Sequence, residues 1–552
     1  MDFQRYLLIA AIAVLSFMLM TEWVHFRQQP AHQPVAEQSH QGAPANADSS
    51  LPEAPASTAT DIPTSAAAPG EHKTQAGDAQ RYVDVKTDLL NIRIDLQGGD
   101  IVYASLPQQS ASLDTPDKPF ILLSQNEPRT FIAQSGLTGI DTSAAHPLYH
   151  SDASSYQLGD KDSVSVVLTY QDENQLQVTK TFTFHRAKYL INIDYQVQNH
   201  GDKPWQGTLF GQLKRDSSAD PSVSSGGLGI SSYLGAAVSK PDSPYHKLPF
   251  KDMADKPFKE QIQGGWVAMV QHYFVSAWIP DANQQNTFST AYSNGMYLAR
   301  FTGQVQTVAP GASAHFDARL YTGPKDQYRL RDISPGLDLT VDYGWLWWIA
   351  QPLFWLLTKI HGMLGNWGWS IMVLTLLVKA AFFWLNAKAY TSMANMRRVQ
   401  PKLMEIRERY ADDRQKQSQE MMNLYKTEKI NPLGGCLPVL VQMPVFLALY
   451  WVLLESVELR HAPWILWIKD LSAMDPYLIL PVLMGLTMFF QQRLNPPPPD
   501  PMQAKVMQWM PLIFTFFFLW FPAGLVLYYV VNNILSIAQQ YVITKRIERK
   551  GV

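Results

Sequence analysis

The sequence WSIMVLTLLVKAAFFWL, residues 369–385, has the pattern of a membrane helix that contains one cation. It is apolar and long enough to cross a bilayer. Lys379 lies well inside it, and a cation at that depth costs roughly 2.5–3.5 kcal/mol on insertion scales, so it indicates a functional site. Two environments suit this lysine. Its stem can extend to the interface, or its ammonium can line a polar, water-accessible cavity between helices.

The overall composition averages over segments that differ strongly in their residue content. It has 552 residues, of which 46% are hydrophobic and 17% are charged, and a formal net charge of −2. This length predicts about two to four domains, and the small net charge indicates no class of partner. The single cysteine, Cys436, lies in an apolar stretch. It excludes a disulfide framework within the chain and is typical of a small buried residue.

The N-terminal segment predicts a membrane anchor followed by a tether. Residues 6–20, YLLIAAIAVLSFMLM, have the length of a secretory signal core, but no small-x-small cleavage site follows them. The apolar span instead runs on to Phe26 and includes Trp23, a residue type of the membrane interface. We therefore expect an uncleaved transmembrane anchor over residues 1–27. Residues 28–80 contain no Phe, Trp or Tyr and are rich in Pro, Ala, Gln and Ser, so we expect a flexible linker.

Residues 81–335 have the pattern of an all-β domain. Apolar side chains alternate with polar ones at Phe182 and Phe184 and along Ile191–Val197, and turn residues follow at Asn199–Asp202. Period-two runs with such punctuation predict an antiparallel sandwich. The histidines show no metal-ligand spacing and no phosphate-binding loop is present, so neither a metal site nor a nucleotide site is predicted. Carboxylate pairs scattered in sequence leave no local pattern, so carbohydrate chemistry stays open.

Two further helical segments flank the lysine-containing span. Residues 343–364 are rich in Trp and predict an amphipathic helix in the membrane interface. Residues 388–430 hold ten basic and six acidic residues, an excess of four positive charges that favours the cytoplasm. Apolar residues recur every three to four positions up to Tyr410, and Asp412 and Asp413 can cap a second helix. This segment therefore predicts a cytoplasmic helical hairpin.

Further apolar segments follow the hairpin. One covers residues 434–457, a shorter one covers 475–492, and a third, 506–543, is too long for one span and is broken at Phe521–Gly524. With the anchor these segments predict six transmembrane helices. An even number of crossings leaves the tail, residues 544–552 with four basic side chains, in the cytoplasm. Both termini are then inside and the β domain is outside.

The polar side chains within these spans support two interpretations. Singly, each is typical of a hydrogen bond between membrane helices. Together, with no Asp or Glu well inside a span to neutralise Lys379, they indicate a hydrophilic pocket around a cation. Such a pocket would hold the polar end of a polypeptide or a transported anion. Besides Lys379, these polar residues are Thr375, Gln442, Tyr528, Tyr529, Asn532, Asn533 and Gln539.

Long motifs in the helical part resemble one known family. They are NPLGGCLP at Asn431–Pro438, QMP at Gln442–Pro444 and LVLYY at Leu525–Tyr529, with further similarity over Gln400–Tyr425 and Phe516–Gly524. With these residues, the helical region closely resembles the YidC membrane protein insertase family. The anchor, linker and large β domain match the form found in Gram-negative inner membranes.

The resemblance implies a fold and a location. The fold would be an α-helical membrane protein with six transmembrane helices, of which five form an insertase core over residues 365–543. The β domain would be an all-β supersandwich of galactose-mutarotase type, without sugar chemistry, lying with the linker in the periplasm. Both termini would be cytoplasmic.

The resemblance also implies a function that is not enzymatic. The protein would be an insertase and chaperone that draws hydrophilic tails of nascent membrane proteins into a cytoplasm-open groove and releases their apolar segments into the lipid bilayer. It would need no cofactor and no nucleotide. Its partners would include the Sec translocon and, weakly through cytoplasmic loops, the ribosome. The implied groove residues are Lys379, Thr375, Gln442, Trp520 and Tyr529, and the implied hydrophobic slide is Phe446 and Phe517.

One residue departs from the family pattern. The groove cation of the family is usually Arg, whereas this chain has Lys379. The charge is kept and the planar fork is lost, so attraction to acidic tails is expected to persist without bidentate contacts. Two other functions stay open. A secondary transporter of an anionic solute would use Lys379 as its binding charge, although the spans show no internal repeat, and a membrane-anchored sugar-modifying enzyme would depend on the β domain alone.

Overall fold

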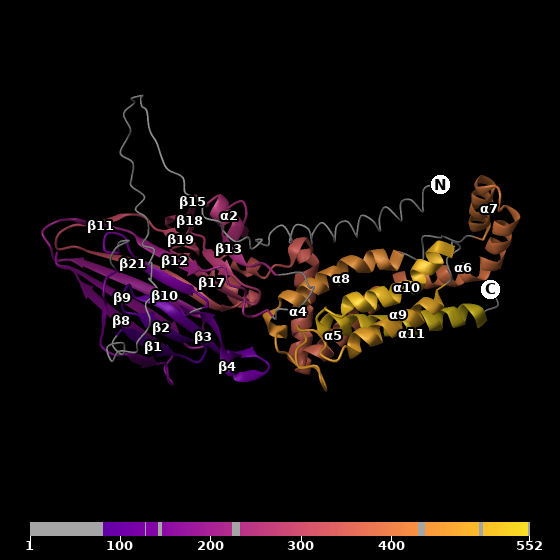
Figure 1. Cartoon of the computed structure of the whole chain (residues 1–552), viewed down its shortest axis with the longest axis horizontal. Helices are drawn as coiled ribbons and strands as arrows, with labels where there is room; N and C mark the ends of the chain where they lie inside the picture. Colours follow the sequence, from indigo (N-terminus) through magenta and orange to yellow (C-terminus); the bar gives the residue numbers. More distant parts are fainter. Residues whose placement is uncertain are drawn as a thin grey trace, which may run out of the picture.

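The computed structural model describes residues 81–126, 128–141, 146–223, 232–428, 437–495 and 501–549. The predicted anchor, the linker and Cys436 lie outside these ranges. The described chain has a β-rich part that ends at Pro324 and a helical part that follows it. Figure 1 shows the two parts side by side along the long axis of the molecule.

The β part contains two large sheets. The first has ten strands, and the second has nine. In order, the first sheet comprises β15 (Lys259–Gln263), β18 (Gln285–Ser293), β19 (Met296–Thr302), β12 (Leu209–Arg215), β5 (Phe131–Leu137), β3 (Asp100–Ser112), β2 (Asn91–Asp95), β1 (Tyr82–Lys86) and β7 (Ser155–Gln157), with β4 (Thr115–Leu123) paired to β3. The second comprises β14 (His246–Pro249), β13 (Gly235–Val238), β16 (Val267–Val270), β17 (Phe274–Pro280), β21 (Ser313–Pro324), β10 (Leu190–Asn199), β9 (Leu176–His185), β8 (Ser163–Gln171) and β6 (His150–Ser151). A separate pair joins β11 (Trp205–Gly207) to β20 (Gln306–Val308).

Side-chain alternation explains how the two sheets share one core. In β9 every second residue is buried, and its neighbour β10 pairs with it in antiparallel register, Phe182 opposite Ile193. Period-two strands bury one face. The buried faces of both sheets contribute to one hydrophobic cluster, which confirms the alternation predicted for Phe182, Phe184 and Ile191–Val197. One buried position in β9 is not apolar, because Lys180 also points inward.

The helical part is built around its last helix. That helix packs against four others, α5, α6, α8 and α9. The main helices are α4 (Trp347–Leu364), α5 (Trp367–Ala381), α6 (Phe383–Arg409), α7 (Arg414–Thr427), α8 (Leu437–Glu455), α9 (Ile479–Leu494), α10 (Pro501–Phe518) and α11 (Ala523–Arg549). The shorter ones are α3 (Gln327–Ile333), η2 (Leu337–Thr340), η3 (Gly344–Leu346) and η4 (Val457–Leu459), whereas α2 (Phe250–Asp255) lies within the β part. The α6–α7 hairpin lies at the end of the molecule farthest from the sheets (Figure 1).

The helical part has a bend where the sequence predicts one continuous span. In the described ranges, no single helix is both long and apolar enough to cross a bilayer; α5 and α6 meet that test together, with an angle of 67° between them. The bend lies at Phe382, where neither Pro nor Gly is present. The break predicted at Phe521–Gly524 is observed between α10 and α11. The number of spans therefore stays a prediction.

Large apolar side chains are exposed along α9 and α10. Exposed apolar surface of this extent marks a contact with lipid or with another protein. It includes Val482, Leu483, Leu486, Phe490, Leu512, Ile513, Phe516 and Phe517.

Candidate functional site

Lys379 lies in the last turn of α5 and faces α11. Its side chain is buried, with 6% of the residue exposed. The ammonium donates to Ser536 Oγ at 2.6 Å and to Asn532 Oδ1 at 3.2 Å, two positions one turn apart on α11. An ammonium has three N–H donors, and the third has no partner among the residues that the structure describes.

Gln442 joins this group from a third helix. It lies on α8 and donates through Nε2 to Asn532 Oδ1 at 2.6 Å, the same oxygen that accepts from Lys379. The partners of Lys379 are thus neutral, and in the described part of the chain no carboxylate lies within ion-pair distance of its ammonium. We call Lys379, Gln442, Asn532 and Ser536 the lysine cluster.

Two other predicted groove residues lie about one turn away from members of the lysine cluster, on the same helices. Thr375 is one turn before Lys379 on α5, is 1% exposed, and donates to Ile371 O at 2.6 Å. Tyr529 is on α11, three residues before Asn532, and its ring lies 4.5 Å from that of Phe446 on α8. The predicted slide residue Phe446 therefore packs directly against a predicted groove residue.

The remaining two predicted residues lie near the α10–α11 break. Trp520 packs edge-to-face on Phe516, with ring centroids 4.9 Å apart. Phe517 is 54% exposed and belongs to the apolar surface of α10. Within the described residues, no hydrogen bond or ring contact joins Trp520 or Phe517 to the lysine cluster. Sequence reasoning missed Ser536, because a lone serine in a membrane helix carries no special pattern; its spacing of four from Asn532 was the available signal.

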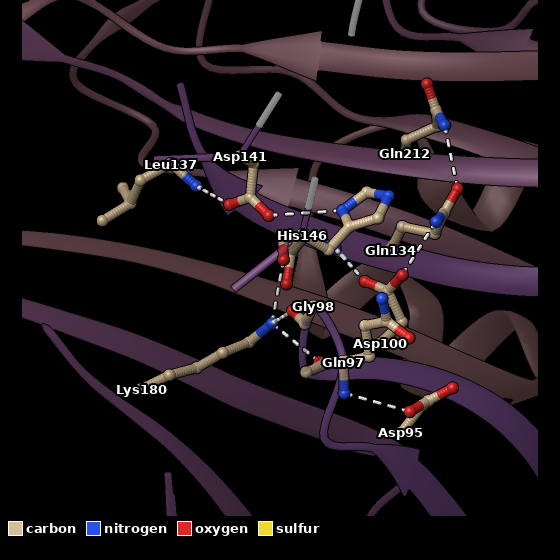
Figure 2. Close-up of polar contacts among 12 residues, drawn as sticks. Asp95, Gln97, Gly98, Asp100, Gln134, Leu137, Asp141, His146, Lys180 and Gln212 are labelled. Carbon is tan, nitrogen blue, oxygen red and sulfur yellow. Dashed lines mark hydrogen bonds and ion pairs between the residues drawn. The ribbon is translucent and has the colours of Figure 1, made fainter. Parts of the chain in front are cut away.

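A second polar cluster is buried in the β part (Figure 2). Lys180 is fully buried and donates to Gly99 O at 2.7 Å, Ser135 O at 2.8 Å and Gly98 O at 3.3 Å. Asp100 accepts from Gln134 Nε2 at 2.8 Å. Burial raises the pKa of Asp100 to about 6 and lowers the pKa of Lys180 to about 8.

The geometry of this second cluster favours a structural role. Gln134 in turn accepts from Gln212 at 3.0 Å, and Asp141 accepts from Leu137 N at 3.0 Å (Figure 2). Lys180 and Asp100 are thus occupied by backbone and amide partners inside the sandwich, and Asp141 also lies 3.4 Å from His146 Nδ1. Lys180 joins β9 of one sheet to β5 and to the Gly98–Gly99 turn before β3 of the other, and Asp100 joins β3 to β5, so the cluster fixes how the sheets pack.

The comparison with known proteins decides the family. Two family models match adjoining parts of the chain: YidC periplasmic domain over residues 82–356 and 60Kd inner membrane protein over residues 359–550. A curated membrane protein insertase YidC from Pseudomonas paraeruginosa (strain DSM 24068 / PA7) is 52% identical over 581 residues, covering 99% of each chain. The chain belongs to the YidC family of membrane protein insertases.

Other YidC proteins match equally well. Those from Azotobacter vinelandii (strain DJ / ATCC BAA-1303) and Pseudomonas syringae pv. syringae (strain B728a) are 53% and 54% identical over 561 and 560 residues, covering 100% and 99% of this chain and 99% of each relative. Among solved structures, an active YidC insertase is 18% identical with a TM-score of 0.37, covering 84% of this chain and 92% of that chain. A galactose mutarotase related enzyme from Lactobacillus acidophilus is 10% identical with a TM-score of 0.30, covering 44% and 97%.

Membership in the YidC family fixes the coarse function. The chain is a membrane protein insertase of the bacterial inner membrane. The predicted family and the prediction that the protein is not an enzyme are confirmed. The family's β domain is periplasmic, as the matching family model states.

Proposed function

We propose that this YidC protein inserts its substrates by receiving their hydrophilic tails at the lysine cluster and releasing their apolar segments along the aromatic side chains of α8 and α10. The observation that carries the proposal is the environment of Lys379: a buried cation that, among the residues the structure describes, is held only by neutral side chains of α11.

The electrostatics of Lys379 favour an acidic guest. A buried charge without a counter-ion is costly, and a partner carboxylate lowers that cost. The third N–H of the ammonium is available for a hydrogen bond to a carboxylate, in which both partners are charged, whereas Ser536 and Asn532 are neutral acceptors. An acidic or strongly polar tail is therefore favoured over a neutral one, and the tail brings its own counter-charge into the site.

The apolar segment of the substrate needs a different surface. Phe446 packs on Tyr529 beside the lysine cluster, and Phe517 extends the aromatic surface along α10. A transmembrane segment that leaves along these side chains exchanges water for lipid and aromatic contacts, which gives about 25 cal/mol per Å² of apolar area. Partitioning can therefore drive insertion without a nucleotide, while the lysine cluster lowers the barrier for the polar flank.

We also propose the topology and the further partners that the family resemblance implies. The α6–α7 hairpin and the end of α11 lie opposite the β part, which supports placing these elements in the cytoplasm and the sheets in the periplasm (Figure 1). The basic excess of the hairpin region supports weak contact with the ribosome. Cooperation with the Sec translocon is part of the same proposal.

The test is insertion into proteoliposomes of a short substrate with two acidic residues in its tail. Lys379→Ala is expected to reduce insertion by about ten- to a hundredfold, because a hydrogen bond to a charged group is worth roughly 1.5–3 kcal/mol. Lys379→Arg is expected to retain insertion. Lys388→Ala, at an exposed lysine on α6, is the matched control. Insertion by Lys379→Ala at the wild-type level would contradict the proposal. So would saturable uptake of an anionic solute, measured in the absence of any polypeptide substrate, that Lys379→Ala abolishes.

A further inference from the structure

The outer end of α8 is held by side chains from the β part. Four residues make these contacts: His272 from the β part, Lys325 directly after its last strand β21, and Glu455 and Arg460 from the end of α8 and the segment after it. We call these four residues the joint. They bring together segments up to 350 residues apart in the sequence.

The centre of the joint is a buried ion pair. Lys325 Nζ lies 2.9 Å from Glu455 Oε2, and the two side chains are 2% and 3% exposed. The ammonium also donates to Thr340 O at 3.1 Å, and Ser232 donates to the other carboxylate oxygen of Glu455 at 2.8 Å. Both oxygens of Glu455 are therefore satisfied, each by a residue from outside the helical part's main helices.

His272 supplies a cap for the same helix end. The last four carbonyls of a helix lack partners within the helix. His272 Nε2 lies 2.8 Å from Leu454 O, and since a carbonyl only accepts, the nitrogen donates. Burial lowers the pKa of His272, which keeps the ring neutral and leaves this single hydrogen bond in place. The β part thus completes the C-terminus of α8.

Arg460 fastens the segment that follows α8. It is 8% exposed and donates through Nη2 to Ser110 O at 2.9 Å and to Ala111 O at 3.2 Å in β3. Its guanidinium lies 5.3 Å and 5.5 Å from the ring centres of Phe120 and Phe274, which stack on each other. The rigid sheets therefore fix both the end of α8 and the direction of the chain beyond it.

We propose that Lys325 and Glu455 are positioning residues for insertion: through them the β part sets the position of α8, and with it Gln442 and Phe446. Gln442 precedes Glu455 by thirteen residues, about 20 Å along one helix at roughly 1.5 Å per residue. The inference rests on the proposed role of α8 in receiving the substrate. A buried ion pair often adds little stability over an apolar pair, but losing one partner leaves an uncompensated charge. We infer that the pair fixes the position of α8 relative to the β part rather than adding stability.

The test compares Lys325→Met, Glu455→Leu and the double variant in the full-length protein in proteoliposomes. Two quantities are measured: insertion of the acidic-tailed substrate, and hydrogen exchange of peptides covering residues 448–474, the end of α8 and its following segment. Lys325→Met is expected to speed this exchange and to slow insertion, each by at least about tenfold, because Glu455 stays buried without its cation. The double variant is expected to recover both, since an apolar pair removes the stranded charge.

The control is Lys240→Met. Lys240 lies 3.1 Å from Glu260, whose side chain is 39% exposed, so this pair has a similar length but a solvated carboxylate. It is expected to insert normally. Unchanged exchange in β9 and β10 would show that Lys325→Met keeps the sandwich folded. The inference is overturned if Lys325→Met inserts within twofold of the wild type, or if the double variant recovers exchange but not insertion.

The same assay separates this inference from the proposed role of Lys379. If Lys379→Ala inserts normally while Lys325→Met is slow, the lysine cluster loses its proposed role and the joint stands. If Lys379→Ala inserts slowly while Lys325→Met inserts normally, the joint has only a structural role and the lysine cluster keeps its proposed role in insertion.

Discussion

Replacing Lys180 by Met should strongly destabilise the β part. Met has a similar length, but it leaves Gly99 O and Ser135 O without their donor, and Asp100 without its nearby cation. Truncating one partner of a buried charge pair costs roughly 3–5 kcal/mol. Each carbonyl left unsatisfied adds to this, but such terms are not additive. We expect a loss of about 4 kcal/mol in the free energy of opening around β9.

Hydrogen exchange measures this loss in the full-length protein. Because 1.4 kcal/mol corresponds to a factor of ten, the slowest amides of β9 and β10 should exchange about a thousandfold faster in Lys180→Met at pH 7. The effect should shrink at pH 5, where Asp100 is protonated and no longer needs a cation. The control is Lys188→Met, because Lys188 is exposed and lies just after the end of β9. An acceleration below tenfold, or one that does not depend on pH, would refute the reasoning.

Three further predictions follow from single contacts. Burial raises the pKa of Asp100 from its ordinary 3.8 to about 6, so as the pH rises the unfolded state loses this proton before the folded state does. The opening free energy of the β part should therefore fall by about 2 kcal/mol from pH 4 to pH 6. Asp100→Asn should flatten this exchange profile, and an unchanged profile would contradict the assignment. Asp413 caps α7 by accepting hydrogen bonds from Gln415 N and Lys416 N at 3.1 and 3.0 Å. Asp413→Ala should therefore cost about 1 kcal/mol and speed hydrogen exchange in α7 about fivefold without affecting α8. The same change in exchange rate in both helices would argue against the cap. A Cβ on Gly485 would clash with Thr515 Oγ1, where α9 packs on α10. Gly485→Ala should therefore lower the unfolding temperature, and adding Thr515→Ala should restore part of the loss. If the double variant recovers nothing, the clash is not the cause.

The local patterns of the sequence predicted much of the structure. Alternation placed Phe182, Phe184 and Ile193 in the core because a strand buries one face. Asp412 and Asp413 were the two predicted caps of the second hairpin helix, and Asp413 caps it, since capping depends only on the next few residues. The break near Phe521–Gly524 was also visible, because Pro and Gly interrupt a helix locally.

Contacts between distant segments could not be predicted in the same way. Lys180 follows the alternation of β9, yet a lysine in a strand is normally expected to face water, so its inward position required knowledge of the carbonyls that meet it. Lys325 and Glu455 are 130 residues apart, and nothing near either residue indicates the other. The bend at Phe382 lacks Pro and Gly, so the sequence predicted a continuous span.

The most direct measurement is a photocrosslinking map of a stalled nascent membrane protein whose acidic tail and apolar segment carry the photoreactive group in turn. The tail probe is expected to mark peptides that contain Lys379, Gln442 and Asn532, and to lose this product in Lys379→Ala but not in Lys379→Arg. The apolar probe is expected to mark Phe446 and Phe517. Tail crosslinks confined to lipid or to the α6–α7 hairpin, unchanged by Lys379→Ala, would contradict the account.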